Sequence, residues 1–347
     1  MQNKERYHSA IDSMRVVAIL AVICIHSTTR ILETNSFNIQ GFSLPFFLNQ
    51  VSRFAVPLFF MISGFVLEIN FPYHQNYLSY LKKRFSRIFL PYFFWSIIYY
   101  FFVYKQHTFS FFQAVLKGSA SYQLYFIPTL LVFYILFPFI HRVYRFISMK
   151  FVLIILGILQ VVLLSQDYYI HPISILFPLN IALLNYYVFI LGIVAARHHN
   201  VLIQYVNKRK VVFVLFQILL ALLIFIEGET LYLKTHNYLY FYSQWRPSIL
   251  LYTIVVFAVS YVLFNRPMKY EVFIRVLSRL SFFVFFIHVI ILEFFWHIIG
   301  RSLFYNTLRL PGQQFWFEPI LFILIVIISY TIAFFVEKIP YMTKITG

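Results

Sequence analysis

The chain has 347 residues, of which 61% are hydrophobic, 22% aromatic and only 11% charged. A soluble domain of this length needs more polar surface, so the composition excludes a soluble globular protein and favours one that uses lipid as its solvent. The formal net charge of +17 is explained by membrane topology and by attraction to anionic lipid head groups, so we expect membrane lipid and no nucleic acid as a partner.

Long apolar stretches recur along the whole chain. Hydrocarbon offers no water to the backbone, so stretches of about 20 apolar residues are expected to cross a bilayer as helices. We therefore predict an all-α, polytopic integral membrane protein with about ten transmembrane helices and both termini cytoplasmic. The predicted spans are 12–30, 45–69, 87–104, 121–140, 150–166, 173–195, 211–227, 247–264, 280–299 and 317–336.

The basic residues provide an independent test of that topology. With both termini inside, 20 of the 28 Lys and Arg residues fall on the inner side and 8 on the outer half. An odd number of spans would scramble this bias, which follows the positive-inside rule. We expect a multi-pass protein of the cell membrane, the bacterial cytoplasmic membrane in particular. Residues 1–347 are expected to form one transmembrane domain with no appended soluble domain.

The first predicted span contains two ionisable side chains, Arg15 and His26. An ionisable group at bilayer depth costs roughly 2.5 to 3.5 kcal/mol and is by default a functional-site candidate. At about 1.5 Å per residue, His26 lies roughly 16 Å along the helix from Arg15, near mid-membrane if Arg15 is at one interface. Asp12 precedes Arg15 by three residues, so the two are predicted to share a helical face and pair. The single cysteine, Cys24, excludes an internal disulfide.

The second predicted span has charged ends and a small-residue centre. Ser63 and Gly64 indicate either a close helix crossing or a place where a ligand approaches the backbone. Arg53 and Glu68 lie near its two ends, and Glu68 is expected to pair with Lys82 or Arg84 rather than to take part in chemistry.

A basic cluster precedes the third predicted span, in the segment LKKRFSRIFLPYFFW. It is either an ordinary positive-inside anchor or a clamp for a phosphorylated cytoplasmic ligand, because guanidinium groups match phosphate oxygens in a bidentate way. Arg84 and Arg87 are three residues apart and share a helical face. Pro91 is expected to fix the helix start or to kink the helix one turn in.

The ninth predicted span contains His288, at about the depth of His26 when measured at roughly 1.5 Å per residue from its inner end. The two imidazoles are predicted to line one cavity, with a satisfied core histidine as the alternative. Glu293 and His297, four residues apart, either hold an acceptor or pair with each other. A metal site is not expected, because no HxxxH spacing or second cluster accompanies them.

Five segments, taken in chain order, resemble the membrane-bound acyltransferase-3 family over residues 11–340. Asp12, Arg15 and His26 match the family's D-x-x-R start and R-x10-H pattern. Tyr125 stands where the family usually has tryptophan, and Val289 follows His288 where proline is common. The segments are IDSMRVVAILAVICIH, PLFFMISGF, KKRFSRIFLPYFFW, YFIPTLLVFYILFP and LSFFVFFIHVIIL.

The resemblance implies an O-acyltransferase that moves an acyl group from a cytoplasmic acyl-CoA to a hydroxyl of an extracytoplasmic cell-envelope glycan or glycolipid. The expected group is acetyl, with succinyl as the alternative, so acetyl-CoA is the first expected donor substrate and no permanently bound cofactor is expected. His26 is the predicted general base, because a neutral imidazole can take the proton of an attacking hydroxyl.

The other predicted site residues serve the two substrates. Asp12 and Arg15 are expected to set the inner mouth, and Arg15, Arg84 and Arg87 to bind CoA phosphates. Ser63 or His288 is expected to steady the developing oxyanion. The supporting residues are Ser63, Arg53, Tyr125, His288 and Glu293.

Two other functions fit a ten-helix bundle with intramembrane His and Arg. One is a transporter or flippase for an envelope polysaccharide, although the sequence lacks the paired broken helices and inverted repeat expected there. The other is an inactive scaffold of a polysaccharide synthesis complex. No oligomeric state is predicted.

Overall fold

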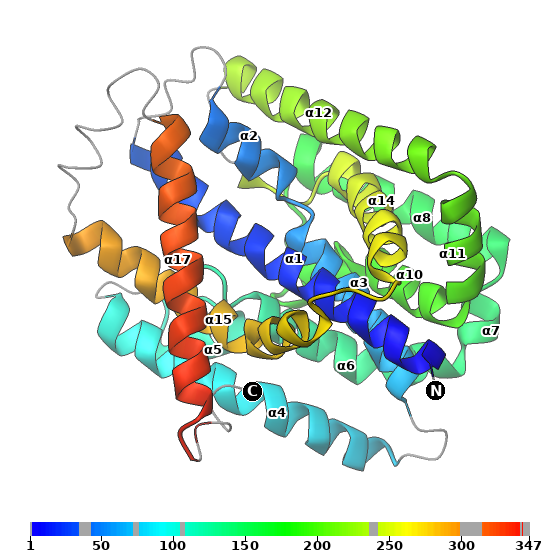
Figure 1. The fold of residues 1–347 in the computed structure, drawn as a ribbon, viewed down its shortest axis with the longest axis horizontal. Coiled ribbons are helices and arrows are strands. Elements are labelled where there is room, and N and C mark those ends of the chain that lie inside the picture. The colour runs from blue at the N-terminus through cyan, green and yellow to red at the C-terminus, as the bar shows by residue number, and fades with distance from the viewer. Residues whose placement is uncertain are drawn as a thin grey trace. The chain divides into compact units, whose positions relative to one another are not determined.

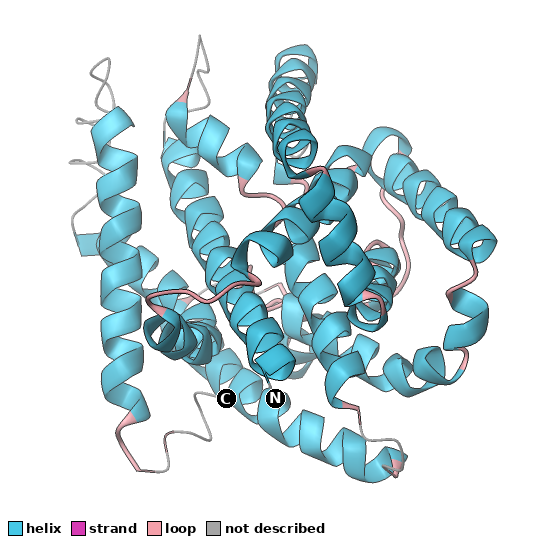
Figure 2. Ribbon diagram, turned by 45° about the vertical axis from the view of Figure 1, so that its right-hand side comes forward, coloured by secondary structure: helices cyan, strands magenta, loops and turns pink. Residues whose placement is uncertain are grey.

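The regular structure of the chain is entirely helical in the residues that the computed structural model describes (Figures 1 and 2). This confirms the predicted all-α class. The described residues are 2–34, 43–71, 76–104, 108–235, 242–298, 314–340 and 342.

Eight helical segments in this described part are long and apolar enough to cross a membrane. A ninth results if the pair Tyr186–Arg197 and His199–Lys208, bent by 93°, counts as one span. The predicted span 121–140 corresponds to a shorter apolar helix, Phe126–Arg142. A polytopic membrane protein is therefore confirmed, while the count of ten spans and the cytoplasmic termini stay predictions.

The chain divides into two compact units. The first unit comprises residues 1–56, 209–244 and 251–340, and the second unit comprises 57–208, 245–250 and 341–347. The helices of the first unit are α1 (Gln2–Thr34), α2 (Leu44–Val51), α12 (Lys210–Thr235), α14 (Pro247–Phe264, from Leu251 on), α15 (Glu271–Ile298) and α17 (Gln314–Glu337).

In the first unit, α1 packs against α2, α15 and α17. The contacts between α1 and α15 rise along both helices in the same order, from Asp12 with Ser278 to His26 with His288. The two helices are therefore parallel, as expected for the first and ninth spans of the predicted topology. Helix α17 also packs against α15, and Glu337, its last residue, pairs with Arg279 in the first half of α15.

The second unit consists of eleven described helical segments, two of them π-helices. They are α3 (Ala55–Asn70, from Pro57 on), α4 (Tyr77–Ile98), η1 (Tyr99–Val103), α5 (Phe111–Lys117), α6 (Phe126–Arg142), α7 (Tyr144–Ile147), α8 (Lys150–Ser165), η2 (Gln166–Ile170), α9 (Leu179–Leu183), α10 (Tyr186–Arg197) and α11 (His199–Lys208), so that the α-helices number nine.

Two glycines let α3 and α10 cross in backbone contact within the second unit. A Cβ at Gly64 would collide with the carbonyl oxygen of Phe189, and a Cβ at Gly192 would collide with the carbonyl oxygen of Met61. Small residues allow such close approach in membrane helices. The interpretation of the Ser63–Gly64 pair as a close helix crossing is thus confirmed.

The prediction for the start of the third span was wrong. Helix α4 begins at Tyr77, ten residues before the predicted residue 87, and Asn76 caps it by accepting from the backbone N–H of Leu78 at 3.0 Å. The basic cluster therefore lies inside the helix, and Pro91 is an interior residue rather than a start. The Asn76 side chain satisfies a backbone N–H that a helix start otherwise leaves unpaired, so the helix begins ahead of the basic cluster.

The predicted partners of Glu68 were also wrong. Its carboxylate pairs with Arg197 and, at 2.9 Å, with His141 Nδ1. These residues lie near the C-terminal ends of α3, α10 and α6, so the carboxylate joins three helix ends and its structural role is confirmed. The Arg197 guanidinium lies 3.6 Å from the ring centroid of Tyr144, and burial raises the pKa of that phenol.

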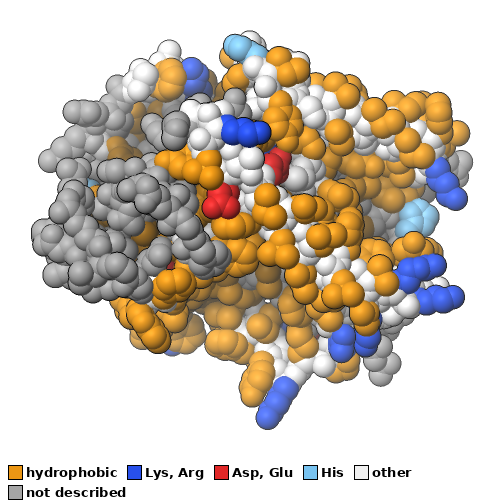
Figure 3. Space-filling view, turned by 90° about the horizontal axis from the view of Figure 1, so that it is seen from above, with side chains coloured by type: hydrophobic (Ala, Val, Ile, Leu, Met, Phe, Trp, Pro, Cys, Tyr) orange, Lys and Arg blue, Asp and Glu red, His pale blue; other side chains and the backbone are white. Residues whose placement is uncertain are grey.

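The molecular surface is largely apolar. In the described part of the face seen in Figure 3, hydrophobic side chains are widespread, and several of the Lys and Arg side chains lie at its edges. Helix α12 exposes large hydrophobic residues along its length, among them Val211, Leu215, Ile218, Leu222 and Ile226. A soluble surface rarely exposes such a continuous apolar stripe, whereas a lipid-facing helix requires it.

Candidate functional site

Two histidines meet in the first unit, one from α1 and one from α15. The ring centroids of His26 and His288 are 5.3 Å apart, and the ring planes are inclined by 30°. His288 is 1% exposed, whereas His26 is half-buried. The predicted meeting of the two imidazoles is therefore present, and His26 is the less buried of the two residues.

The hydrogen bonding of His288 defines what its ring can do. Its Nδ1 lies 3.0 Å from the backbone oxygen of Val284. A carbonyl oxygen only accepts, so Nδ1 is the protonated nitrogen, and in the neutral ring Nε2 has a lone pair. Within the described structure this buried Nε2 has no hydrogen-bond partner. A neutral His288 thus accepts rather than donates, which argues against its predicted role as an oxyanion donor.

A buried polar cluster fixes Arg53 beside the same part of α1. Arg53, 5% exposed, donates from Nε to Asn49 Oδ1 at 3.0 Å and from Nη1 to the Tyr242 carbonyl at 2.6 Å. Asn49 in turn donates from Nδ2 to the Ile25 carbonyl at 3.2 Å. Arg53 was predicted only as a supporting residue, and the structure places its charge within electrostatic reach of His26.

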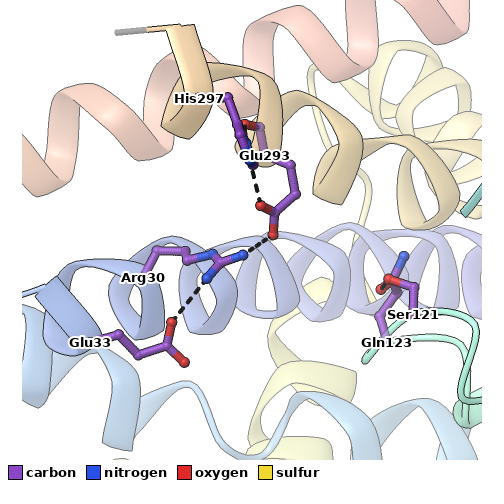
Figure 4. A network of polar contacts seen from close by, with 6 residues as sticks. All are labelled: Arg30, Glu33, Ser121, Gln123, Glu293 and His297. Carbon is purple, nitrogen blue, oxygen red and sulfur yellow. Dashed lines mark hydrogen bonds and ion pairs between the residues drawn. The ribbon is translucent and has the colours of Figure 1, made fainter. Parts of the chain in front are cut away.

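A charged cluster follows one helical turn beyond His26 (Figure 4). Arg30 pairs with Glu293 of α15 and, at 3.1 Å, with the exposed Glu33. Its guanidinium also lies 5.5 Å from the ring centroid of Trp296. His297 Nδ1 is 4.0 Å from the Glu293 carboxylate, so the expected pairing is present, but Arg30 is a partner that the sequence did not indicate.

Glu318 is a candidate site residue that sequence reasoning missed. It is fully buried on α17, and its Oε1 accepts a hydrogen bond from Ser27 Oγ at 2.8 Å. Its Oε2 has no hydrogen-bond partner within the described structure. The signal was present, because Glu318 is the only charged residue of the predicted span 317–336 and an ionisable group in such a span suggests function.

The predicted pair at the inner end of α1 is confirmed. Arg15 Nη1 lies 3.4 Å from Asp12 Oδ1. The same oxygen accepts from Ser278 Oγ at 2.7 Å, which ties the pair to α15. The Arg15 side chain is 35% exposed and can therefore contact a second anionic group.

The two predicted arginines of α4 lie in the second unit and differ in their surroundings. The Arg84 guanidinium is 5.8 Å from the ring centroid of Tyr80 and 5.9 Å from that of Tyr134. Arg87 is exposed. Aromatic faces hold Arg84 in place while its planar group keeps edges free for hydrogen bonds.

The remaining predicted residues of the second unit have local roles in the structure. Ser63 donates from Oγ to the Phe59 carbonyl at 2.8 Å, so its hydroxyl proton is already used. The Tyr125 ring meets Trp245 edge-on at 6.3 Å, which places a tryptophan from another segment against this position. Ser121 Oγ, also drawn in Figure 4, donates to Gln123 Oε1 at 2.5 Å.

In the described part of the chain, no group of three or more His, Cys, Asp and Glu side chains is arranged to hold a metal ion. The first unit instead places polar groups at successive heights along α1. From the inner end outward these are the Asp12–Arg15 pair, the two histidines and the Arg30–Glu293 pair. The two imidazoles therefore lie between two charged pairs along α1.

Comparison with known proteins identifies the family. A family model described as an acyltransferase domain matches residues 8–337, nearly the whole chain. Comparisons with curated proteins and with solved structures gave no significant match. The matched region contains every site residue described above. This membrane protein of several apolar helices belongs to the acyltransferase-3 family.

Proposed function

We propose that this membrane acyltransferase takes an acyl group from a cytoplasmic acyl-CoA and transfers it to a hydroxyl of an extracytoplasmic cell-envelope carbohydrate. Acetyl is the expected group, with succinyl as the alternative. Family membership supports acyl transfer as such. The observation that carries the proposal is the contact of the His26 imidazole on α1 with the buried His288 of α15, whose ring centroids are 5.3 Å apart.

In the proposed reaction the acceptor hydroxyl oxygen attacks the thioester carbonyl carbon while His26 takes the hydroxyl proton. The carbon–sulfur bond then breaks, and the CoA thiolate takes that proton from the His26 imidazolium. The products are an ester and free CoA thiol, so atoms and charge balance. General-base catalysis of this kind typically contributes about 10² to 10⁴-fold in rate. The lone pair on His288 Nε2 suits it to accept an N–H from His26 and orient the ring.

The donor is proposed to contact the inner cations through its phosphates. Arg15 offers a guanidinium at the inner end of α1, already oriented by Asp12. On α4, Arg87 is exposed and Arg84 is held over two aromatic rings. Charge-assisted bonds from guanidinium to phosphate are among the stronger hydrogen bonds in proteins.

The proposal is tested in inverted membrane vesicles, which expose the cytoplasmic face to added acyl-CoA. Vesicles containing the protein are given acetyl-CoA with a radiolabelled acetyl group, and free CoA thiol and labelled glycan are measured. We expect both to appear, and vesicles without the protein to show neither. CoA release and labelling at the background level would refute the proposal and favour a transporter or an inactive scaffold. Succinyl-CoA in a parallel assay distinguishes the two acyl groups.

A further inference from the structure

Glu318 has one carboxyl oxygen that the fold does not use. The side chain is 0% exposed, and Oε2 has no partner within the described structure. A buried polar atom without a hydrogen bond is destabilising and rare in folded proteins. Either a ligand supplies the missing bond, or the residue is retained for its other oxygen alone.

The link between α17 and α1 uses only one of the two oxygens of the Glu318 carboxyl group. Oε1 links α17 to α1 through Ser27, and this bond needs one acceptor oxygen. An uncharged side chain such as glutamine would provide that acceptor without burying an ionisable group. The second oxygen therefore calls for a separate reason.

The position of Glu318 suggests what supplies the missing bond. Its partner Ser27 directly follows His26, the proposed general base, and both helices belong to the first unit. In the predicted topology α17 begins at the outer side, and Glu318 lies in its second turn. A molecule that reaches His26 from outside therefore arrives beside the turn of α1 to which Glu318 is joined.

We propose that Glu318 binds the acceptor, with Oε2 accepting a hydrogen bond from a hydroxyl adjacent to the one that is acylated. This inference rests on the proposed function. A carbohydrate carries neighbouring hydroxyl groups, so one can be held by Glu318 while the other faces His26. A carboxylate oxygen accepts such a bond, whereas a carboxamide nitrogen only donates. The residue is thus a determinant of specificity for polyol acceptors over water.

The test uses the full-length protein in inverted vesicles with labelled acetyl-CoA and the endogenous glycan, and measures CoA released and glycan labelled. For Glu318→Gln we expect at least a tenfold loss of glycan labelling, with a fall in the ratio of glycan labelled to CoA released. The dissociation constant of the purified protein for acetyl-CoA should change by less than about twofold, since the donor is held elsewhere.

Two control variants separate binding from structure. Ser27→Ala removes the link between α1 and α17 but leaves Oε2 in place, so it should lower labelling by less than about threefold. Glu337→Gln makes the same change at the other end of α17, where the carboxylate is partly exposed and pairs with Arg279, and should leave labelling unchanged. Glu318→Asp retains a carboxylate and should recover part of the activity lost in Glu318→Gln.

Several results would overturn the inference. Equal losses in Ser27→Ala and Glu318→Gln would make Glu318 a structural link only. Full labelling by Glu318→Gln would mean that Oε2 binds nothing needed for transfer. A matching loss of acetyl-CoA affinity or of thermal stability would remove the acceptor role. If wild-type vesicles release no CoA, the proposed function itself fails, and this is seen before any variant is compared.

Discussion

Helices approach each other closely in two places by opposite means. In the first unit, α1 and α15 meet through polar side chains, among them His26 with His288 and Arg30 with Glu293. In the second unit, α3 and α10 meet through Gly64 and Gly192, with backbone against backbone. Small residues and interhelical polar contacts are the two usual ways in which membrane helices associate.

The difference between the two interfaces indicates where chemistry is expected. A glycine crossing leaves no side chain to react and gains its stability from close packing. The α1–α15 interface buries ionisable groups instead, which is costly in an apolar protein and makes a functional origin the default expectation. Variants at the two interfaces should therefore fail in different ways, in activity at one and in stability at the other.

The largest effect is expected for His26→Ala. We expect acyl transfer to fall by about 10² to 10⁴-fold, because the proposed general base is lost, while expression, membrane insertion and thermal stability stay near normal. CoA release and glycan labelling in vesicles measure acyl transfer, and a melting curve of the purified protein measures thermal stability. If His26→Ala kept most of its activity, His26 would not be the general base. The α1–α15 interface and the glycine crossing would then not differ in the way proposed.

The next effect concerns the donor. Arg15→Ala, Arg84→Ala and Arg87→Ala should each weaken acyl-CoA binding by about 1.5 to 3 kcal/mol, since each removes one of the proposed charge-assisted bonds to phosphate. Affinity is measured with purified protein in detergent at low and high salt. The loss at the exposed Arg87 should shrink most at high salt, because salt already screens an exposed charge.

Basic residues outside the proposed donor contacts provide the control. Lys208 and Arg209 are both exposed, and their change to Ala should alter acyl-CoA affinity little. If the Lys208 and Arg209 variants lose as much acyl-CoA affinity as the Arg15, Arg84 and Arg87 variants do, the basic residues of the inner segments only set the membrane topology.

At the glycine crossing we expect a loss of stability rather than of catalytic competence. Gly64→Val places two methyl groups and a Cβ against the Phe189 carbonyl, and overpacking of this kind costs about 1 to 3 kcal/mol or more. Gly157→Ala is the matched control, because its Cβ would meet only the end of the Tyr187 side chain, which can move. The melting temperatures of both variants test this prediction. An unchanged melting temperature for Gly64→Val would contradict the close crossing of α3 and α10.

The smallest effect is expected at an exposed ion pair. Arg279 and Glu337 pair at 2.7 Å, with side chains that are 61% and 26% exposed. Pairs of this kind contribute about 0 to 1 kcal/mol, so Arg279→Gln should shift the melting temperature little. A loss as large as that of Gly64→Val would show that α15 and α17 depend on this pair, and that polar contacts in the first unit serve stability as well.

Local patterns let several features be predicted from the sequence alone. The apolar spans follow from composition, and the Asp12–Arg15 pair follows from a spacing of three on one helix. His26 was singled out because an ionisable residue in an apolar span is costly wherever the helix packs. Its meeting with His288 was predicted from equal depth, which needs only the rise per residue and a common direction across the membrane.

Other features depended on how each helix is rotated about its axis. Ser27 and Glu318 are 291 residues apart, and Arg30 and Glu293 are 263 apart, so no local spacing relates them. The partners of Glu68 were predicted wrongly for the same reason, whereas the start of α4 depends on the local cap at Asn76. A helix that is apolar all round carries little periodic signal of which face turns inward. The sequence by itself therefore determined which residues are costly to bury and at what depth they lie, and only tertiary packing decided which of them meet.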